Sequence, residues 1–125
     1  MRVEQINQGV WAMTYLVVCE ETNKATLIDP VWDNISDYLS ILEDQGLELT
    51  HCMATHTHAD HITGCFTLKE KTGCEYIMWN DTPCLGVSVF VDEETSIAMG
   101  NLEFRFHFVP GHTSDSMIIE VDGFM

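Results

Sequence analysis

The sequence predicts an α/β protein built from layers of sheet and helix. Short apolar, β-branched runs alternate along the chain with two segments of helical periodicity, and this order favours a layered architecture. Residues 102–109 (LEFRFHFV) also alternate apolar and polar side chains, which is typical of a strand buried on one face. A chain of 125 residues is long enough for one such domain with its own core.

The first part of the chain predicts a hairpin, a helix and a strand. Residues 11–19 (WAMTYLVVC) and 24–29 (KATLID) are apolar runs joined by the polar EETN, a pattern that indicates a β-hairpin. The segment from Asn34, as N-cap, to Gly46, as stop, predicts a helix, because apolar side chains recur at helical spacing at Ile35, Tyr38, Leu39 and Leu42. Residues 49–55 (LTHCMAT) then predict a strand.

The second part predicts one more helix and three strands. The helix is expected over residues 63–71, ended by Gly73, and a short strand over 75–79 (EYIMW). After the alternating strand at 102–109, residues 116–121 predict a last strand, which leads into Asp122 and Gly123. An Asp-Gly pair is typical of a hairpin turn, so a further strand is expected to follow it.

Composition excludes several classes of partner. The formal charge is −15, from 20 acidic residues against five Lys and Arg. Nucleic-acid binding needs clustered basic residues, so we expect no nucleic acid partner. The apolar runs are too short to cross a bilayer, so we expect no membrane partner. No signal peptide is visible, so we expect a protein that is not secreted. Its expected location is the cytoplasm, or an organellar matrix after processing. The five cysteines are odd in number and form no CxxC pair, so we expect reduced, buried thiols.

The densest chemical signal is THTHADH, residues 55–61. If this segment is extended, His56 and His58 point the same way and converge on one ion, with Asp60 and His61 just beyond. A helical conformation, with residues 58 and 61 one turn apart, is the alternative. Imidazole and carboxylate groups suit Zn²⁺ and Fe²⁺ better than Ca²⁺ or Mg²⁺. The cluster therefore predicts a transition-metal site.

Residues outside the cluster complete the candidate site. His112, in PGHT after a predicted strand, is the best candidate for a ligand from a second loop. Asp29, in LIDP at the end of another strand, either caps a turn or orients a ligating imidazole through a hydrogen bond. His51 and His107 lie inside predicted strands without a partner motif, so structural roles are expected for them.

These three motifs, LIDP, THTHADH and PGHT, resemble the metallo-β-lactamase superfamily in order and spacing. The sequence of these motifs is most similar to that of the persulfide dioxygenases, a branch near glyoxalase II. The resemblance implies an αββα sandwich, of which this chain covers the N-terminal half to two-thirds, and a small-molecule, thiol-derived substrate such as glutathione persulfide.

The resemblance also implies ligand sets. In the dioxygenase branch one Fe²⁺ is held by His56, His112 and a later aspartate, and glutathione persulfide is oxidised to sulfite and glutathione. In the hydrolase branch one or two Zn²⁺ ions act on a thioester: His56, His58 and His112 hold the first, whereas Asp60 and His61 contribute to the second. Asp60 is assigned a catalytic role. A module that binds metal without catalysis is the remaining alternative.

The end of the sequence departs from the family pattern. The later aspartate ligand has no equivalent before Met125, so residues 1–125 are interpreted as one metallo-β-lactamase-like domain truncated at its C-terminal side, with a natural short relative as the alternative. Little catalytic activity is expected from this chain alone. Self-association is expected through the uncovered sheet.

Overall fold

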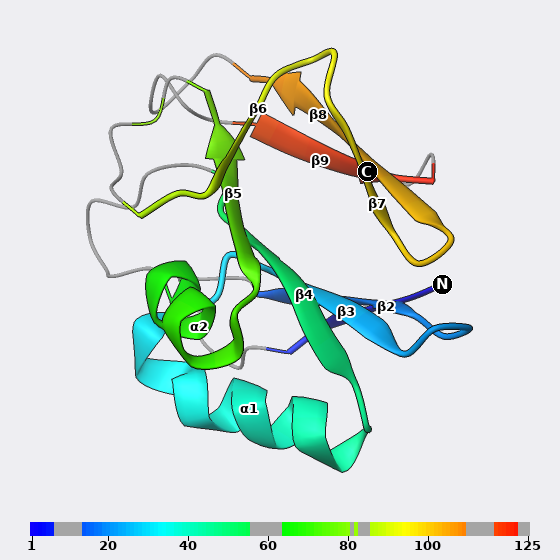
Figure 1. Cartoon of the computed structure of the whole chain (residues 1–125), viewed down its shortest axis with the longest axis vertical. Helices are drawn as coiled ribbons and strands as arrows, with labels where there is room; N and C mark the ends of the chain where they lie inside the picture. Colours follow the sequence, from blue (N-terminus) through cyan, green and yellow to red (C-terminus); the bar gives the residue numbers. More distant parts are fainter. Residues whose placement is uncertain (7–13, 56–63, 81, 83–85, 110–116, 123–125) are drawn as a thin grey trace.

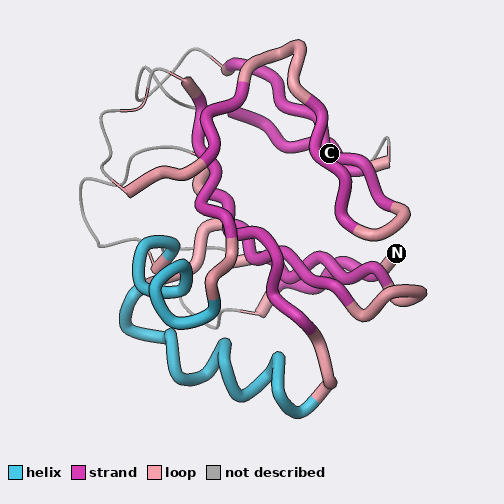
Figure 2. Tube along the Cα trace, in the orientation of Figure 1, coloured by secondary structure: helices cyan, strands magenta, loops and turns pink. Residues whose placement is uncertain are grey.

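The computed structural model places two sheets and a layer of helices on one another (Figure 1). It describes residues 1–6, 14–55, 64–80, 82, 86–109 and 117–122. Figure 2 shows the strands gathered in the two sheets and the helices on one side. None of the helices within these residues is long and apolar enough to cross a membrane. The predicted layered fold is confirmed.

The larger sheet is mixed, with its strands in the order of the sequence. The first three strands pair antiparallel and the following ones pair parallel. The parallel strands β3, β4 and β5 therefore end at the same edge of the sheet. The strands are β1 (Arg2–Gln5), β2 (Tyr15–Cys19), β3 (Lys24–Ile28), β4 (Glu48–Met53), β5 (Glu75–Trp79) and β6 (Val89–Val91).

Two α-helices cover one face of this sheet: α1 (Ile35–Asp44), preceded by the 3₁₀ turn η1 (Trp32–Asn34), and α2 (Cys65–Thr72). Asn34 occupies the predicted N-cap position of α1, but its side chain makes no capping hydrogen bond. Gly46 and Gly73 follow the two helices with φ of 65° and 76°, a left-handed conformation that glycine adopts without steric cost. Both predicted helix stops are confirmed.

The smaller sheet is an antiparallel meander of β7 (Ser96–Met99), β8 (Leu102–Phe108) and β9 (Met117–Val121). The alternation predicted for β8 is confirmed at Leu102, Phe104 and Phe106, which are buried, but not at Phe108, the last residue of the strand, which is 40% exposed. The three buried side chains face the larger sheet and pack with Met53 and Ile77. The smaller sheet thus covers the face that the helices leave free.

Two separate cores hold the layers together. The core between helices and sheet includes Leu16, Leu27, Tyr38, Leu68 and Tyr76. The core between the two sheets takes the opposite side chains of the same strands, such as Val17, Met53 and Ile77. This division follows from the period of two in a strand, which sends successive side chains to opposite faces.

Two predicted strands end earlier than expected. The strand predicted over residues 24–29 ends at Ile28 because Asp29 turns into the left-handed region, with φ of 55°. The strand predicted over 49–55 ends at Met53, although Ala54 N–H still donates to Ile77 O at 3.1 Å. The strand β3 therefore stops just before Asp29, and β4 stops two residues before Thr55.

Candidate metal centre

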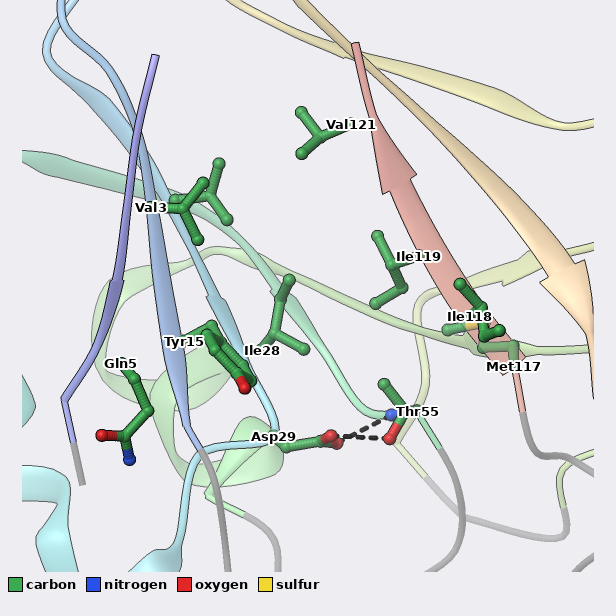
Figure 3. Close-up of a pocket in the computed structure, with 11 residues that line it drawn as sticks. Val3, Gln5, Tyr15, Ile28, Asp29, Thr55, Met117, Ile118, Ile119 and Val121 are labelled. Atoms are coloured by element: carbon green, nitrogen blue, oxygen red, sulfur yellow. Dashed lines mark hydrogen bonds between the residues drawn. The ribbon is translucent and has the colours of Figure 1, made fainter. Parts of the chain in front are cut away.

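Asp29 binds the residue that precedes the histidine cluster. Its two carboxylate oxygens accept hydrogen bonds from Thr55 N–H at 2.7 Å and from Thr55 Oγ1 at 2.6 Å (Figure 3). Asp29 N–H also donates to Met53 O at 2.7 Å, which continues the parallel pairing of β3 with β4. The start of the segment that follows Thr55 is consequently fixed by main-chain and side-chain contacts together.

A buried polar network supports the turn that carries Asp29. Thr14 Oγ1 donates to Asp29 O at 2.8 Å and lies 3.1 Å from the hydroxyl of Tyr38 on α1. Val31 N–H donates to the same hydroxyl at 3.0 Å. Tyr38 and Thr14 are 1% and 0% exposed, so both hydroxyl groups are shielded from water. Tyr38 of α1 therefore connects the helix layer to the turn that carries Asp29.

The cluster segment, residues 56–63, is followed by a residue that contacts the same turn. Gly64 N–H donates to Pro30 O at 2.8 Å. A Cβ atom at Gly64 would lie 2.8 Å from Ile35 Cδ1, so glycine permits this close approach. Residues 56–63 thus leave from Thr55, bound to Asp29, and come back at Gly64, bound to Pro30. Adjacent residues of one turn anchor both ends.

The second motif segment is anchored at the same place. Met117 N–H, at the start of β9, donates to Thr55 O at 2.8 Å. Residues 110–116, which contain PGHT, connect the end of β8 to this point. Thr55 is therefore the junction from which the histidine cluster departs and to which the PGHT segment returns.

The predicted ligands themselves lie outside the described residues. This applies to the cluster residues His56, His58, Asp60 and His61, and to His112. Within the six ranges that the structure describes, no three His, Cys, Asp or Glu side chains gather as a metal site. The candidate centre depends on the two motif segments, and the structure supplies the anchors of both.

The two remaining histidines lie on strands. His51 of β4 is half-buried, and its Nδ1 lies 2.7 Å from Thr50 Oγ1. Burial lowers the pKa of His51, opposed by the nearby carboxylate of Glu75. His107 of β8 lies with Nε2 2.8 Å from Glu120 Oε1 of β9. Both contacts suit the structural roles predicted for these residues.

A cavity of about 500 Å³ lies beside the hydrogen-bonded pair Asp29 and Thr55. Figure 3 shows Val3 on one side of it and Ile119 and Val121 of β9 on the other. Its walls are largely aliphatic, and Asp29 and Thr55 lie at the end next to the motif segments. The two sheets are therefore separated at this edge.

The donor set of the two motif segments fits a transition metal. Four imidazoles and one carboxylate, from His56, His58, Asp60, His61 and His112, are the groups that bind Zn²⁺ and Fe²⁺. The Asp29 carboxylate accepts two hydrogen bonds immediately before the first of them. The residues that flank the two segments, Thr55, Gly64 and Met117, are anchored near one another by the bonds to Asp29, Pro30 and Thr55.

Sequence reasoning missed several supporting groups. Thr14 and Tyr38 meet across 24 positions of the sequence, and only the pairing of the hairpin with α1 brings them together. Thr55 belongs to the quoted motif, yet its role is carried by its backbone and hydroxyl rather than by a metal-binding group. A polar residue inside an otherwise apolar strand run, such as Thr14, is the signal that could have revealed the network.

The chain belongs to the metallo-β-lactamase superfamily, because residues 12–123 match the model of that family. Its relatives include the mitochondrial persulfide dioxygenase ETHE1 of Mus musculus, which is 33% identical over 101 residues, covering 80% of this chain and 39% of that protein. The hydroxyacylglutathione hydrolase of Rhodospirillum rubrum is 38% identical over 101 residues, covering 79% and 39%. The chain thus spans about two-fifths of the length of these relatives.

The fold agrees with a solved structure of the same group. ETHE1 from Myxococcus xanthus superposes with a TM-score of 0.89 at 33% identity, and the match covers 97% of this chain and 54% of that one. The predicted metallo-β-lactamase fold is therefore confirmed. The layers described above, helices on a mixed sheet on a second sheet, form part of that domain.

Proposed function

We propose that this chain carries the metal-binding half of a persulfide dioxygenase, which holds one Fe²⁺ and oxidises glutathione persulfide. The single observation that carries the proposal is the bond from Met117 N–H to Thr55 O, because it brings the His56 and His112 segments to one junction. Similarity to the mouse and Myxococcus proteins supports the dioxygenase branch. The enzyme would be active in a longer protein that supplies a carboxylate ligand.

His56 and His112 would hold the ion, and His58, Asp60 and His61 would surround it. When bound there, Fe²⁺ would supply open coordination positions for a thiolate-like sulfur and O₂. The net reaction converts glutathione persulfide, O₂ and water to glutathione, sulfite and two protons. Asp29 acts on this site through Thr55: it holds the first residue of the cluster segment and so reduces the number of conformations that the ligands must lose on binding.

A glyoxalase II-like hydrolase is the second candidate. The similarity to the hydroxyacylglutathione hydrolase of Rhodospirillum rubrum favours it. In this reading His56, His58 and His112 hold a first Zn²⁺, and Asp60 and His61 contribute to a second. When bound there, zinc would supply Lewis-acid activation of water for hydrolysis of a thioester. Both candidates use a small glutathione-derived substrate, so they differ in metal and reaction rather than in the class of ligand.

The cellular setting is part of the proposal. The mouse relative is a mitochondrial protein, and we propose either the cytoplasm or an organellar matrix for this chain. The charge of −15 argues against a nucleic acid partner, since it repels phosphate.

Elemental analysis by mass spectrometry tests the proposal. The chain, without an affinity tag, is loaded anaerobically with Fe²⁺ or Zn²⁺ and passed through a desalting column, and the same is done for a version extended to the length of its relatives. We expect about one iron per extended chain, weaker retention by the 125-residue chain, and O₂-dependent release of sulfite from glutathione persulfide by the extended form. Two zincs with thioester hydrolysis would support the hydrolase instead.

Matched histidine variants make this measurement specific. His56→Ala and His112→Ala should each abolish retention of iron. His107→Ala is the control, because His107 lies on β8 beside Glu120 and belongs to neither motif segment. Equal loss of iron in all three variants would show that the histidines act on folding alone. Metal retention without either reaction in the extended protein would favour the non-catalytic module.

A further inference from the structure

Two cysteine sulfurs that flank the cluster segment in sequence are in contact. Cys52 Sγ of β4 and Cys65 Sγ, on the first residue of α2, lie 2.8 Å apart. A disulfide bond measures about 2.0 Å, so a movement of less than an ångström separates this contact from a covalent bond. The two residues stand 13 positions apart, and the histidine cluster lies between them in sequence.

Burial limits the reactivity of the pair. Both residues are 0% exposed and lie in the core between helices and sheet. Burial raises the pKa of Cys52 well above its ordinary value, and the thiol of Cys65 raises it further. The thiolate is the reactive form, so the closed protein reacts slowly. Reaction therefore requires a local opening in which the start of α2 moves away from β4.

A third thiol lies close to the pair. Cys74, which is 4% exposed, belongs to the same core, and its thiol contributes to the raised pKa of Cys52. The thiol of Cys74 nevertheless has its own polar partner: burial raises the pKa of Cys74, and a side-chain hydrogen bond with Thr72 opposes that rise. The direct sulfur–sulfur contact joins Cys52 to Cys65, which makes that pair the one expected to bond.

We propose that Cys52 and Cys65 are a modification site, at which a low-molecular-weight disulfide such as glutathione disulfide oxidises the pair to an intramolecular disulfide. One thiolate attacks a sulfur of glutathione disulfide and releases one glutathione. The second thiol then displaces the other glutathione from the mixed disulfide. Two protein S–H bonds are lost, one S–S bond forms, and the oxidant is reduced to two molecules of glutathione.

The disulfide bond would join the two residues that flank the cluster segment on its N-terminal and C-terminal sides. Noncovalent contacts already anchor its ends, from Thr55 to Asp29 and from Gly64 to Pro30. A disulfide from residue 52 to residue 65 closes a short loop outside both anchors, so it restricts the unfolded chain. The equilibrium constant for unfolding should fall on the order of a hundredfold for a loop of this size.

Trypsin provides a clean assay because of where Lys and Arg stand. Cleavage leaves Cys52 and Cys65 together in the peptide 25–69, Cys74 and Cys84 in 72–105, and Cys19 in 3–24. The native 125-residue chain is incubated with glutathione disulfide, alkylated in denaturant and digested. We expect peptide 25–69 to lose two hydrogens and carry no alkyl group, and this product to form several-fold faster in urea below the unfolding transition.

Two variants and two outcomes decide the proposal. Cys74→Ala should still form the product, whereas Cys65→Ala should leave Cys52 alkylated in peptide 25–69. Reduction by dithiothreitol should restore two alkylation sites. The proposal is overturned if peptide 25–69 of the folded chain stays doubly alkylated under oxidation. It is equally overturned if peptide 25–69 becomes linked to peptide 72–105, since the bond would then belong to Cys74 or Cys84.

Discussion

Asp29 adopts a backbone conformation that most residues avoid. Its φ of 55° lies in the left-handed region, which aspartate enters more readily than bulky residues. The turn is held through all of its polar groups: the N–H binds Met53 O, the carbonyl accepts from Thr14 and the carboxylate accepts from Thr55. These contacts offset the strain and let Asp29 end β3 and hold Thr55 at once.

Substitution of Thr55 tests this arrangement without disturbing the strained backbone. Thr55→Val keeps the shape of the side chain but removes the hydroxyl that donates to Asp29. A carboxylate oxygen loses a partner, so the free energy of unfolding should fall by about 1–3 kcal/mol, measured by urea denaturation. Thr55→Ser is the control, because it keeps the hydroxyl. Equal losses for both variants would contradict a role for this hydrogen bond.

At the scale of elements, the sequence predicts those whose pattern is local. The hairpin of β2 and β3, both helices and the strands β4, β5, β8 and β9 are predicted by periodicity and turn residues, and all are present. The strands β1, β6 and β7 were not predicted. They contain three or four residues each, too few to show a period, and their conformation is determined by pairing with β2, β5 and β8.

The site divides in the same way. Its candidate ligands are visible in the sequence because they cluster in THTHADH and PGHT, whereas their positions stay a prediction. The groups that anchor these segments leave no such pattern. The bond from Met117 to Thr55 joins main-chain atoms 62 positions apart by residue number, and a backbone N–H has no sequence signature.

The contact between α1 and the Asp29 turn gives a prediction at this scale. Tyr38→Phe removes the hydroxyl bound by Val31 N–H and by Thr14. A buried N–H is left without that acceptor, so stability should fall by about 1–3 kcal/mol. Circular dichroism during urea unfolding measures the loss.

A second buried tyrosine provides the matched control. Tyr76 is as buried as Tyr38, and its hydroxyl lies 3.3 Å from the sulfur of Met78, a weak acceptor. Tyr76→Phe should cost clearly less than Tyr38→Phe. If the two variants lose the same stability, removal of a buried hydroxyl explains both and the turn network has no special weight.

At the scale of the whole molecule, the two sheets meet along part of their faces. Asn101, in the turn between β7 and β8, contacts Cys19 and Glu21 at the end of the hairpin, whereas the cavity of about 500 Å³ separates β9 from β1 and β2. Among the described strands, β9 pairs with β8 alone. An open strand edge beside an aliphatic cavity is suited to pairing with another strand.

We propose that the isolated chain self-associates through β9. Ile118 on this strand is 42% exposed, and Ile118→Lys places a charge at the edge, which opposes strand pairing. Sedimentation velocity should show a concentration-dependent dimer or larger species for the parent chain and mainly monomer for the variant. Phe66→Lys, at a residue 46% exposed on α2, is the control. A monomeric parent chain at all concentrations would disprove the proposal.

The junction at Thr55 has a consequence for how such proteins can diverge. The bond from Met117 to Thr55 uses only main-chain atoms, so no side-chain replacement removes either partner, proline at Met117 excepted. Any sequence that forms β4 and β9 in this arrangement retains the link. The residues of the two motif segments can then change, and with them the ligands, the metal and the reaction. The point at which the two segments are joined stays the same. One scaffold can in this way serve both dioxygenases and hydrolases.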